Sequence, residues 1–598
     1  MTFTTRPELV GTHGMVASTH WLASQSGMAV LEAGGNAFDA AVAAGLVLHV
    51  VEPHLNGLGG DLPVIAMHPG GEPFVVCGQG VAPAAATPAR FAELGLGHVP
   101  GTGHLAAVVP GAFGGWLELL AQHGTWSFPD VARYAIGYAR DGFPLIPRAA
   151  ETIARVADLF RAHWPSSAAT WLPGGAAPVP GARFANPDLA ATLQRLSDEA
   201  AAAPTRETGI EAARRAFYEG FVAEAVDLFC RTPLMDSTGT PHAGLLSGAD
   251  LAAWRATEEP TVSVTFAGRR VHKTGPWGQG PVLLQQLLML EALGVADLRP
   301  GSVELVHAVT EVAKLALADR DAWYGDPAVA DVPLDDLLDP RYAAARASVI
   351  GHEASGVWRA GDVAGRDAPT GHPGLARAVA GLPAAGGGAW TGEPTLGSAT
   401  PGDVQRGDTC HLDVVDAAGN VVSATPSGGW LQSSPTVPGL GLQLPTRAQM
   451  FWLDDGVAST LRPGTRPRTT LSPTIVVGDG EVVACGTPGG DQQDQWQTCV
   501  LVNHLVFGMN LQEAIDAPAW HTTHLVSSFD PRTVELRGLH VESRLGDDVV
   551  AALRARGHLV TDAGPWSLGR VSAVGRRDDG LLHAAANPRG MQGYAVGR

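Results

Sequence analysis

The sequence has few cysteines, and none of them are spaced as a pair. The five cysteines, Cys77, Cys230, Cys410, Cys485 and Cys499, are odd in number and scattered, with no CxxC motif. This pattern predicts neither a disulfide framework nor a zinc site built on thiolates. We therefore expect reduced thiols and a cytoplasmic protein.

Basic residues and long apolar runs are also scarce. The 598 residues include 40 lysines and arginines against 59 acidic residues, a formal net charge of −19. A surface of that sign is poorly suited to phosphates, so we expect neither nucleic acid nor an anionic membrane as a partner. The most apolar run, Val42 to Val51, is about half of the roughly 20 residues that span a bilayer. The N-terminal residues also lack the pattern of a secretory signal.

Glycine and proline are abundant, with 75 and 44 residues. Most of them lie between segments of periodic hydrophobicity, as expected for a large loop-rich enzyme. Residues 366–407 differ, because Gly, Pro and Ala dominate there and no packing pattern remains. A stretch of that length without structure is rare inside a compact domain unless it has a function. We expect a lid or processing segment over residues 366–408.

Helical spacing of apolar residues marks much of the chain. Two helices are expected between Leu22 and Leu48, the first ended by Gly34 and Gly35 and the second capped by Asn36. Further helices are expected over residues 130–140, 189–196, 213–229, 281–293, 303–321, 495–507 and 511–517. The glycines at positions 57, 59 and 60 lack the preceding strand and following helix of a dinucleotide-binding loop, so no cofactor is expected there.

Strand patterns appear after residue 409. His411–Ala424 alternates apolar and polar residues about a turn at 416–420, which predicts a β-hairpin. Thr474–Val477 and Glu481–Cys485 predict a second hairpin around residues 478–480. Two hairpins followed by helices favour an α+β layer in this part of the chain.

Thr409 stands where the unpatterned segment meets the first of these strands. A threonine at such a junction is where a self-cleaving hydrolase would create a new N-terminal nucleophile. An ordinary residue at the entry to a strand is the alternative. Cys410 is a rival nucleophile, but successive strand residues face opposite sides, so only one of the two can enter a pocket.

Short motifs recur in one order along nearly the whole chain. They occupy residues 15–18, 34–41, 52–53, 57–60, 109–111, 275–280, 314–321, 324–327, 472–474, 488–490 and 587–589. In this order they resemble the γ-glutamyltransferase family of N-terminal-nucleophile hydrolases. The resemblance implies a precursor that cuts itself between Asp408 and Thr409. The resulting large subunit, residues 1–408, and small subunit, residues 409–598, would form one folded unit.

The resemblance also implies a fold and a base for the nucleophile. The fold is an α+β, four-layer αββα sandwich with additional helices from the large subunit. The base is the α-amine that cleavage frees on Thr409. The pKa of an α-amine in short peptides is about 7.7–8.0, which leaves a usable fraction unprotonated at neutral pH, ready to take the proton of the hydroxyl.

Other site residues follow from the same resemblance. Gly489 and Gly490 come after a predicted strand and would supply oxyanion-hole N–H groups, with a plain turn as the alternative. Ser427 stands where the family usually has a second threonine that hydrogen-bonds the nucleophile; an ordinary loop serine is the alternative. Thr469 and Thr470 replace a serine pair and would donate hydrogen bonds to substrate.

Two departures point away from γ-glutamyl substrates. Gln79 occupies the place of an arginine that holds the glutamyl carboxylate, and glutamine cannot form the same charge-assisted fork. Residues 444–451 lack the acidic partner of the substrate ammonium. The lead-in to Thr409, together with Ser427 and residues 109–116, looks more like the oxamate amidohydrolase-like and acylase-like branch.

Several residues have two interpretations. Trp430 and Gln432 either shape the acyl pocket or belong to a surface loop. His521 and His524 have helical spacing for a metal, and His20 and His54 could be bases, but no third ligand stands at metal-site spacing. We expect no metal and no cofactor. The run Asp319-Arg320-Asp321 predicts a packed ion-pair network or a solvated helix face.

The sequence therefore predicts an autoprocessing threonine-dependent amidohydrolase or acylase that cleaves a small amide through an acyl-enzyme. One alternative is a γ-glutamyl transferase acting on glutathione-like donors. Another is an unprocessed binding protein without catalysis. The expected partners are the amide substrate and the two subunits of one precursor, with a higher oligomer possible.

Overall fold

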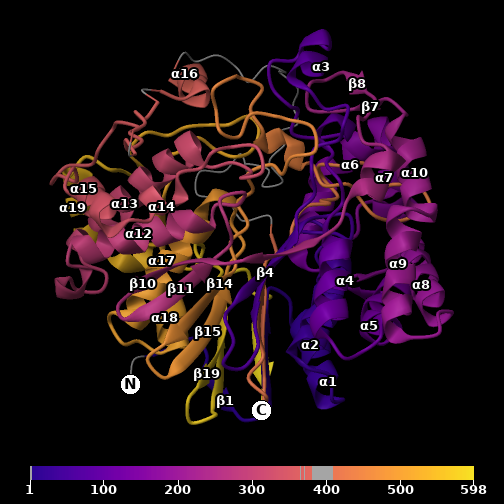
Figure 1. Cartoon of the computed structure of the whole chain (residues 1–598), viewed down its shortest axis with the longest axis horizontal. Helices are drawn as coiled ribbons and strands as arrows, with labels where there is room; N and C mark the ends of the chain where they lie inside the picture. Colours follow the sequence, from indigo (N-terminus) through magenta and orange to yellow (C-terminus); the bar gives the residue numbers. More distant parts are fainter. Residues whose placement is uncertain (1–2, 364, 370, 380–408) are drawn as a thin grey trace.

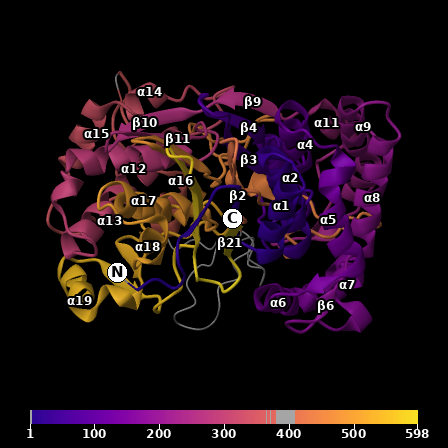
Figure 2. The same cartoon turned by 90° about the horizontal axis from the view of Figure 1, so that it is seen from below.

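Two β-sheets packed face to face form the centre of the molecule, and helices cover the outer face of each (Figure 1). The computed structural model describes residues 3–363, 365–369, 371–379 and 409–598. Seen from below, the same helix, sheet, sheet, helix order runs across the molecule (Figure 2). The predicted α+β, four-layer αββα sandwich is confirmed.

The first sheet contains the strand that follows Thr409. Its seven strands, in spatial order, are β21 (Tyr594–Gly597), β2 (Gly14–Ser18), β12 (Leu412–Asp416), β13 (Val421–Ala424), β3 (Leu62–Met67), β4 (Phe74–Gly78) and β9 (Thr257–Pro260). All neighbours are antiparallel, and Leu412 pairs with Ala424 on one side and Ser18 on the other. The predicted hairpin β12–β13 is confirmed and lies at the centre of the sheet.

The second sheet also has seven strands. In spatial order they are β1 (Leu9–Gly11), β20 (Leu582–Ala586), β19 (Ser572–Arg577), β15 (Glu481–Gly486), β14 (Thr474–Gly478), β11 (Arg269–Lys273) and β10 (Val262–Phe266). The predicted hairpin β14–β15 is confirmed. Smaller sheets join β16 (Trp520–Thr522), β17 (Gly538–Val541) and β18 (Leu559–Asp562), then β5 (Phe143–Pro144) with β6 (Arg183–Phe184), and β7 (Leu234–Met235) with β8 (Pro241–His242).

Helices from the first half of the chain cover the first sheet, on the right in Figure 1. They are α1 (Trp21–Glu32), α2 (Ala37–Val51), α4 (Ala112–His123) and α5 (Phe128–Asp141), with α6 (Pro147–His163), α7 (Pro165–Trp171), α8 (Pro187–Ala201), α9 (Arg206–Tyr218), α10 (Phe221–Cys230) and α11 (Gly248–Ala253) around them. The predicted cap of α2 is confirmed: Asn36 accepts from the N–H groups of Phe38 and Asp39, and Asp39 accepts from Asn36.

The second sheet is covered by helices from the later part of the chain, on the left in Figure 1. They are α12 (Gly280–Ala292), α13 (Val303–Trp323), α17 (Gln493–Leu505) and α18 (Leu511–Asp516), with α14 (Leu334–Leu337), α15 (Pro340–Ala347) and α19 (Asp547–Ala555) nearby. The remaining short helices are α3 (Pro88–Glu93) and α16 (Pro373–Val379). The 3₁₀ turns are η1 (His104–Ala106), η2 (Pro173–Gly175), η3 (Val295–Asp297), η4 (Arg447–Met450), η5 (Gly490–Gln492) and η6 (Ser543–Leu545).

Strand alternation divides the interior into three apolar layers. On β12, Leu412 and Val414 pack into the core under the first helices, whereas Val415 points between the two sheets beside Met15. The third layer lies between the second sheet and its helices. Because side chains on a strand alternate in direction, one strand serves two of these layers. Both faces of β12 are therefore fixed, and so is the direction of each residue at its start.

Two expectations need correction. The helical stretch predicted over residues 213–229 is divided in two: α9 ends at Tyr218 and α10 begins at Phe221, with Gly220 between them in a non-helical conformation of φ −114° and ψ −142°. The segment predicted to lack structure contains helix α16. Residues 380–408, including Asp408, lie outside the described residues.

Among the described residues, no helix is both long enough and apolar enough to cross a bilayer. The longest helix on these faces, α13, carries a buried run of charged residues instead of a continuous apolar surface.

Candidate active site

Thr409 and Ser427 are brought together just before β12. They form an isolated antiparallel bridge, and their hydroxyl oxygens lie 3.2 Å apart. The Cys410 N–H donates to the Pro426 carbonyl at 3.0 Å, which holds the two segments in register. Both hydroxyl-bearing residues are buried. The predicted pair of hydroxyls is thus adjacent, although its catalytic role remains a prediction.

Cys410 faces the opposite way, toward helix α2. Its thiol donates to Glu52 Oε2 at 2.9 Å and accepts from Asn56 Nδ2 at 3.1 Å. Burial and the adjacent Glu52 carboxyl raise the pKa of the thiol well above its usual value. A protonated, buried thiol is a poor nucleophile. The Cys410 side chain therefore lies in the core under the first helices, on the side of the strand that the expected alternation assigns to it.

A glycine-rich loop holds the Ser427 segment in place. A Cβ at Gly60 would lie 2.1 Å from the Ser427 carbonyl oxygen, and one at Gly57 would lie 2.7 Å from that of Gly429. Only glycine permits such a close approach of two backbones. The next residue, Asp61, exchanges two backbone hydrogen bonds with Ser427, at 2.8 and 3.0 Å. The loop joins a helix to a strand, the reverse of the order in a dinucleotide-binding loop.

Gly489 and Gly490 follow β15 and have positive φ angles of 132° and 52°. A Cβ at Gly489 would lie 2.2 Å from the ring of Trp496, so this position requires glycine. At the end of β15, a Cβ at Gly486 would lie 2.2 Å from the ring of His411. The glycine pair therefore leaves its strand close to where residues 409–411 enter β12. Its role as an oxyanion hole remains a prediction.

A buried ionic network supports the glycine pair. Arg320 pairs with Asp491 and donates to Gln279 Oε1 at 2.9 Å, while Gln279 Nε2 donates to the Gly490 carbonyl at 3.2 Å. Ser528 donates to Asp491 through its N–H and hydroxyl, at 2.9 and 2.6 Å. Of the two interpretations of the charged run at 319–321, the packed network is correct.

The pKa of Asp491 shows which effect dominates in this network. Burial acts to raise the pKa, but Arg320, Arg468 and the Ser528 hydrogen bonds outweigh it and hold the pKa below its usual range. Asp491 is therefore a carboxylate that anchors the first residues after the glycine pair. Sequence reasoning missed this residue, since only the spacing to Gly490 could have indicated it.

Gln79 and Thr469 are in contact with each other. Thr469 Oγ1 donates to Gln79 Oε1 at 2.9 Å, and Gln79 Nε2 donates to the Pro467 carbonyl. Both ends of Gln79 are thus engaged within the protein. Thr470 Oγ1 is buried and has no hydrogen-bond partner in the described part of the chain. Of these three predicted substrate contacts, Thr470 has an unused hydroxyl.

Trp430 and Gln432 lie in the interior, so the surface-loop interpretation is wrong. Trp430 Nε1 donates to the Leu55 carbonyl at 2.8 Å, and Gln432 Nε2 donates to that of His54 at 2.9 Å. The Trp430 ring lies 6.2 Å from the ring of Phe529. These contacts tie the loop after Ser427 to the segment after helix α2.

The same loop contains an ion pair that sequence reasoning missed. Arg447, at the start of η4, donates through Nε to both oxygens of Asp61, at 2.9 and 3.2 Å. Both side chains have no exposed surface. The sequence of residues 444–451 shows only that the acidic partner of a substrate ammonium is missing. In the folded protein the same segment places the cation Arg447 beside Asp61.

The histidines considered as bases or ligands are buried and neutral. Burial lowers the pKa of His20 to about 3, and its Nδ1 accepts from the Leu22 N–H as the cap of α1. Burial likewise lowers the pKa of His524 to about 3 and that of His54 and His521 well below the usual value. A neutral, desolvated imidazole that resists protonation is poorly suited to act as a general base, and His20 has a structural role.

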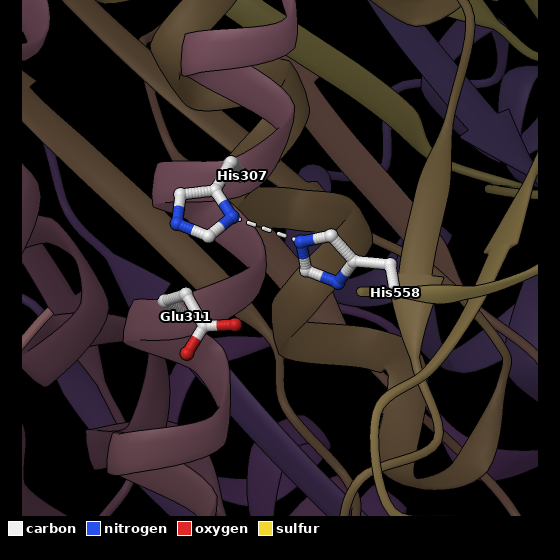
Figure 3. Close-up of side chains that lie close together, drawn as sticks. All are labelled: His307, Glu311 and His558. Carbon is white, nitrogen blue, oxygen red and sulfur yellow. Dashed lines mark hydrogen bonds between the residues drawn. The ribbon is translucent and has the colours of Figure 1, made fainter. Parts of the chain in front are cut away.

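One cluster of the described residues has the spacing of metal ligands: His307, Glu311 and His558 (Figure 3). Most of its ring and carboxylate atoms have partners, although His558 Nδ1 is buried without one in the described part of the chain. His307 Nδ1 lies 2.9 Å from His558 Nε2, and its Nε2 donates to the Gly351 carbonyl at 2.9 Å. Glu311 forms an ion pair with Lys314 at 2.6 Å. The cluster belongs to the outer helical layer, and we assign it a packing role.

The chain matches a known family model over nearly all of its length. The family, described as gamma-glutamyltranspeptidase, matches residues 23–597. The chain is 32% identical to the glutathione hydrolase-like YwrD proenzyme of Bacillus subtilis over 98% of this chain and 99% of that one. It is also 32% identical to the oxamate amidohydrolase proenzyme of Klebsiella pneumoniae, with the same coverage.

The fold matches a solved structure equally well. A structure of LmbA2991HD superposes with a TM-score of 0.91 and 51% identity, covering the whole of both chains.

Proposed function

This chain belongs to the gamma-glutamyltranspeptidase family, and we propose that it is an autoprocessing amidohydrolase or acylase with Thr409 as its nucleophile. The observation that carries the proposal is the buried contact of 3.2 Å between the hydroxyls of Thr409 and Ser427, at the first residue after residues 380–408. The proenzyme relatives, one of them an oxamate amidohydrolase, support the same class of reaction.

Processing would begin at the peptide bond between Asp408 and Thr409. The Thr409 hydroxyl attacks the Asp408 carbonyl, so that an ester replaces the peptide bond. The hydroxyl proton passes to the Thr409 nitrogen, which becomes the free α-amine as the C–N bond breaks. Water then hydrolyses the ester to the Asp408 carboxylate and restores the Thr409 hydroxyl. The products would be a large subunit, residues 1–408, and a small subunit, residues 409–598. Because strands of both subunits are interleaved within each sheet, they would stay together as a heterodimer.

Substrate turnover would use the same hydroxyl. The α-amine takes the hydroxyl proton, Oγ attacks the amide carbon, and the proton passes to the departing amine. Ser427 would hold the nucleophile by a hydrogen bond, and the N–H groups of Gly489 and Gly490 would stabilise the oxyanion. Loss of one such donor typically slows turnover on the order of 100-fold or more. Water completes the cycle by hydrolysing the acyl-enzyme ester.

A γ-glutamyl transferase is the second candidate, which the glutathione hydrolase-like relative favours. The structure offers it less support, because Gln79 is neutral and both ends of its side chain are engaged. Turnover of γ-glutamyl-p-nitroanilide that accelerates with dipeptide acceptors would favour this candidate. For the compartment we propose the cytoplasm, since all five cysteines are free and buried.

The experiment is a rapid-quench reaction of the cleaved protein with a panel of p-nitroanilides, followed by intact mass of the small subunit. A burst of p-nitroaniline equal to the enzyme concentration, with an acyl adduct that maps to Thr409, would support the proposal. A burst whose adduct maps to another residue, or turnover without any adduct in a Thr409→Ala protein, would contradict it.

A further inference from the structure

One face of the central hairpin carries a column of polar side chains that begins at Thr409. The cross-strand pairs on this face, all in one register, are Thr409 with Ser427, His411 with Thr425 and Asp413 with Ser423. Successive pairs on one face lie two residues, or about 7 Å, apart along the strand. None of the six side chains has exposed surface. A buried polar column of this kind requires a partner for every group.

His411 and Asp413 form a pair within this column. His411 Nε2 lies 2.9 Å from Asp413 Oδ1, and His411 Nδ1 lies 3.0 Å from Thr425 Oγ1. Because a carboxylate only accepts, Nε2 carries a proton and donates it to Asp413. In the neutral ring, Nδ1 then accepts from the Thr425 hydroxyl. Both ring nitrogens are used, so the orientation of the imidazole is fixed.

The same pair contacts the second sheet at one place. Gly486, the last residue of β15, pairs with Ser572 on β19. Ser572 Oγ donates to Asp413 Oδ2 at 3.1 Å, and a Cβ at Gly486 would lie 2.2 Å from His411 Cε1. Only glycine leaves room for the ring so close to the β15 backbone. A hydrogen bond and a close packing contact therefore join β12 to the end of β15.

This contact lies between the two halves of the proposed site. Thr409 stands two residues before His411, and Gly489 stands three residues after Gly486. Extended chains of two and three residues span at most roughly 7 and 11 Å. The imidazole between the two strands therefore limits how far the Thr409 hydroxyl and the Gly489 loop can move apart. A displacement of about 1 Å at a reacting centre can cost on the order of 100-fold in rate.

We propose that His411 and Asp413 are a positioning pair for the acyl-transfer reaction. They hold the strand that begins at Thr409 against the strand that leads to the glycine pair, and neither side chain touches the substrate. No bond is made or broken at either residue. This inference rests on the proposed function, since it assigns the separation of nucleophile and oxyanion donors to the imidazole.

The first test changes the imidazole and measures kcat and KM separately with a p-nitroanilide, counting active sites by the burst. His411→Asn keeps a polar atom for Thr425 but is too short to reach Asp413. We expect kcat to fall by about 10- to 100-fold with KM within about twofold of wild type. His411→Gln can still donate to Asp413 and should keep kcat within about fivefold. An unchanged kcat in folded His411→Asn, or a change in KM alone, would overturn the inference.

The second test moves the imidazole without changing it. Gly486→Ala places a methyl group against the ring and should lower kcat as His411→Asn does. In the His411→Ala background the ring is absent, so Gly486→Ala should then cost little more, which is strong coupling in a double-mutant cycle. Additive losses would contradict the role of the ring. If His411→Asn does not fold, Gly486→Ala on its own decides the question.

A matched pair elsewhere in the second sheet is the control. A Cβ at Gly575 would lie 2.2 Å from His583 Nε2, and that nitrogen lies 2.9 Å from Glu481 Oε1. Gly575→Ala and His583→Asn thus disturb a similar buried contact between a glycine and an imidazole. They should lower the melting temperature but leave kcat per active site within about twofold. A loss of kcat equal to that of Gly486→Ala would show a general effect of loosening the sheet and overturn the inference.

The burst separates this inference from the proposed function. A wild type that gives no burst and no acyl adduct on Thr409 would contradict the proposed function and the inference together. A wild type with a full burst, whose folded His411→Asn and Gly486→Ala variants turn over at the wild-type rate, would leave the function standing and overturn the inference alone.

Discussion

The hydroxyl oxygens of Thr409 and Ser427 lie 3.2 Å apart across a single antiparallel bridge, buried at the edge of the central hairpin. Strand β12 begins three residues later, and its alternation sends Cys410 into the helical core. The bridge therefore selects which of two adjacent nucleophilic side chains meets the second hydroxyl. This geometry leads to the predictions below.

Ser427→Ala should slow amide turnover by about 10- to 100-fold, because the nucleophile loses a buried hydrogen-bond partner. Ser427→Thr keeps the hydroxyl and should retain most of the rate. The measurement is kcat with a p-nitroanilide substrate. Equal rates for Ser427→Ala and wild type would show that this hydroxyl does not act on Thr409.

Gly489→Ala should reduce both turnover and stability. The residue has a φ of 132°, and the new Cβ would lie 2.2 Å from the Trp496 ring, so the loop must move. We expect at least a 100-fold loss of kcat if the N–H groups of this loop bind the oxyanion. Gly508→Ala is the control, since Gly508 also has a positive φ of 68° but no atom within 4 Å of the new Cβ. It should lose stability without losing rate per folded molecule.

Cys410→Ala should still process and turn over. The pKa of the thiol is raised well above its usual value by burial and by Glu52, so the thiol is not the nucleophile. We expect a loss of about 1 to 3 kcal/mol in the free energy of unfolding, because Glu52 and Asn56 lose a buried partner. Native protein should also resist iodoacetamide at this position. Complete loss of self-cleavage in Cys410→Ala, with the protein folded, would assign the chemistry to the thiol.

Asp491→Asn should destabilise the protein by about 1 to 3 kcal/mol, because it removes one of the two buried carboxylates that pair with Arg320, the other being Asp321. Asp479→Asn is the control: the Asp479 side chain is 69% exposed in its pair with Arg269, so we expect a loss of about 1 kcal/mol or less. Melting temperatures measured by calorimetry at pH 7 would compare the two variants. Similar losses would show that the network does not stabilise the fold.

The same carboxylate predicts a pH dependence. The pKa of Asp491 is lowered in the folded state, so its contribution is present above the ordinary aspartate pKa of about 3.9 and is lost as the pH falls through the lower folded value. Wild type should therefore lose more stability than Asp491→Asn between about pH 4 and pH 2. Parallel curves for the two proteins over that range would contradict this assignment.

Local signals in the sequence were sufficient for the hairpins and for the capped helix α2. The hairpin can be predicted from the alternation of apolar and polar residues over 411–424, and the start of α2 from Asn36, which caps the helix that follows it. Both signals involve residues close together in sequence. The prediction of one helix across residues 213–229 was wrong because the apolar spacing continues through Gly220, whereas the backbone leaves the helical conformation there. The four layers could be expected only from the resemblance, since strands such as β2 and β21 pair across the whole length of the chain.

The same distinction between local and long-range signals applies to the residues of the candidate active site. Thr409 and Ser427 are 18 residues apart on one hairpin, so a local pattern brings them together. The partnership of Asp61 with Arg447 joins residues 386 positions apart, and no spacing rule could predict it. The support that Asp491 gives to the glycine pair is also a property of the fold, because its partner Arg320 belongs to helix α13.

The central claim is tested most directly by self-cleavage. Purified wild type, Thr409→Ala and Cys410→Ala would be incubated and compared by denaturing gel and intact mass. The account predicts fragments of residues 1–408 and 409–598 in wild type and Cys410→Ala, and an intact chain in Thr409→Ala. A wild-type chain that stays intact, or a Thr409→Ala chain that still cleaves at this bond, would contradict it and favour a non-catalytic protein or another nucleophile.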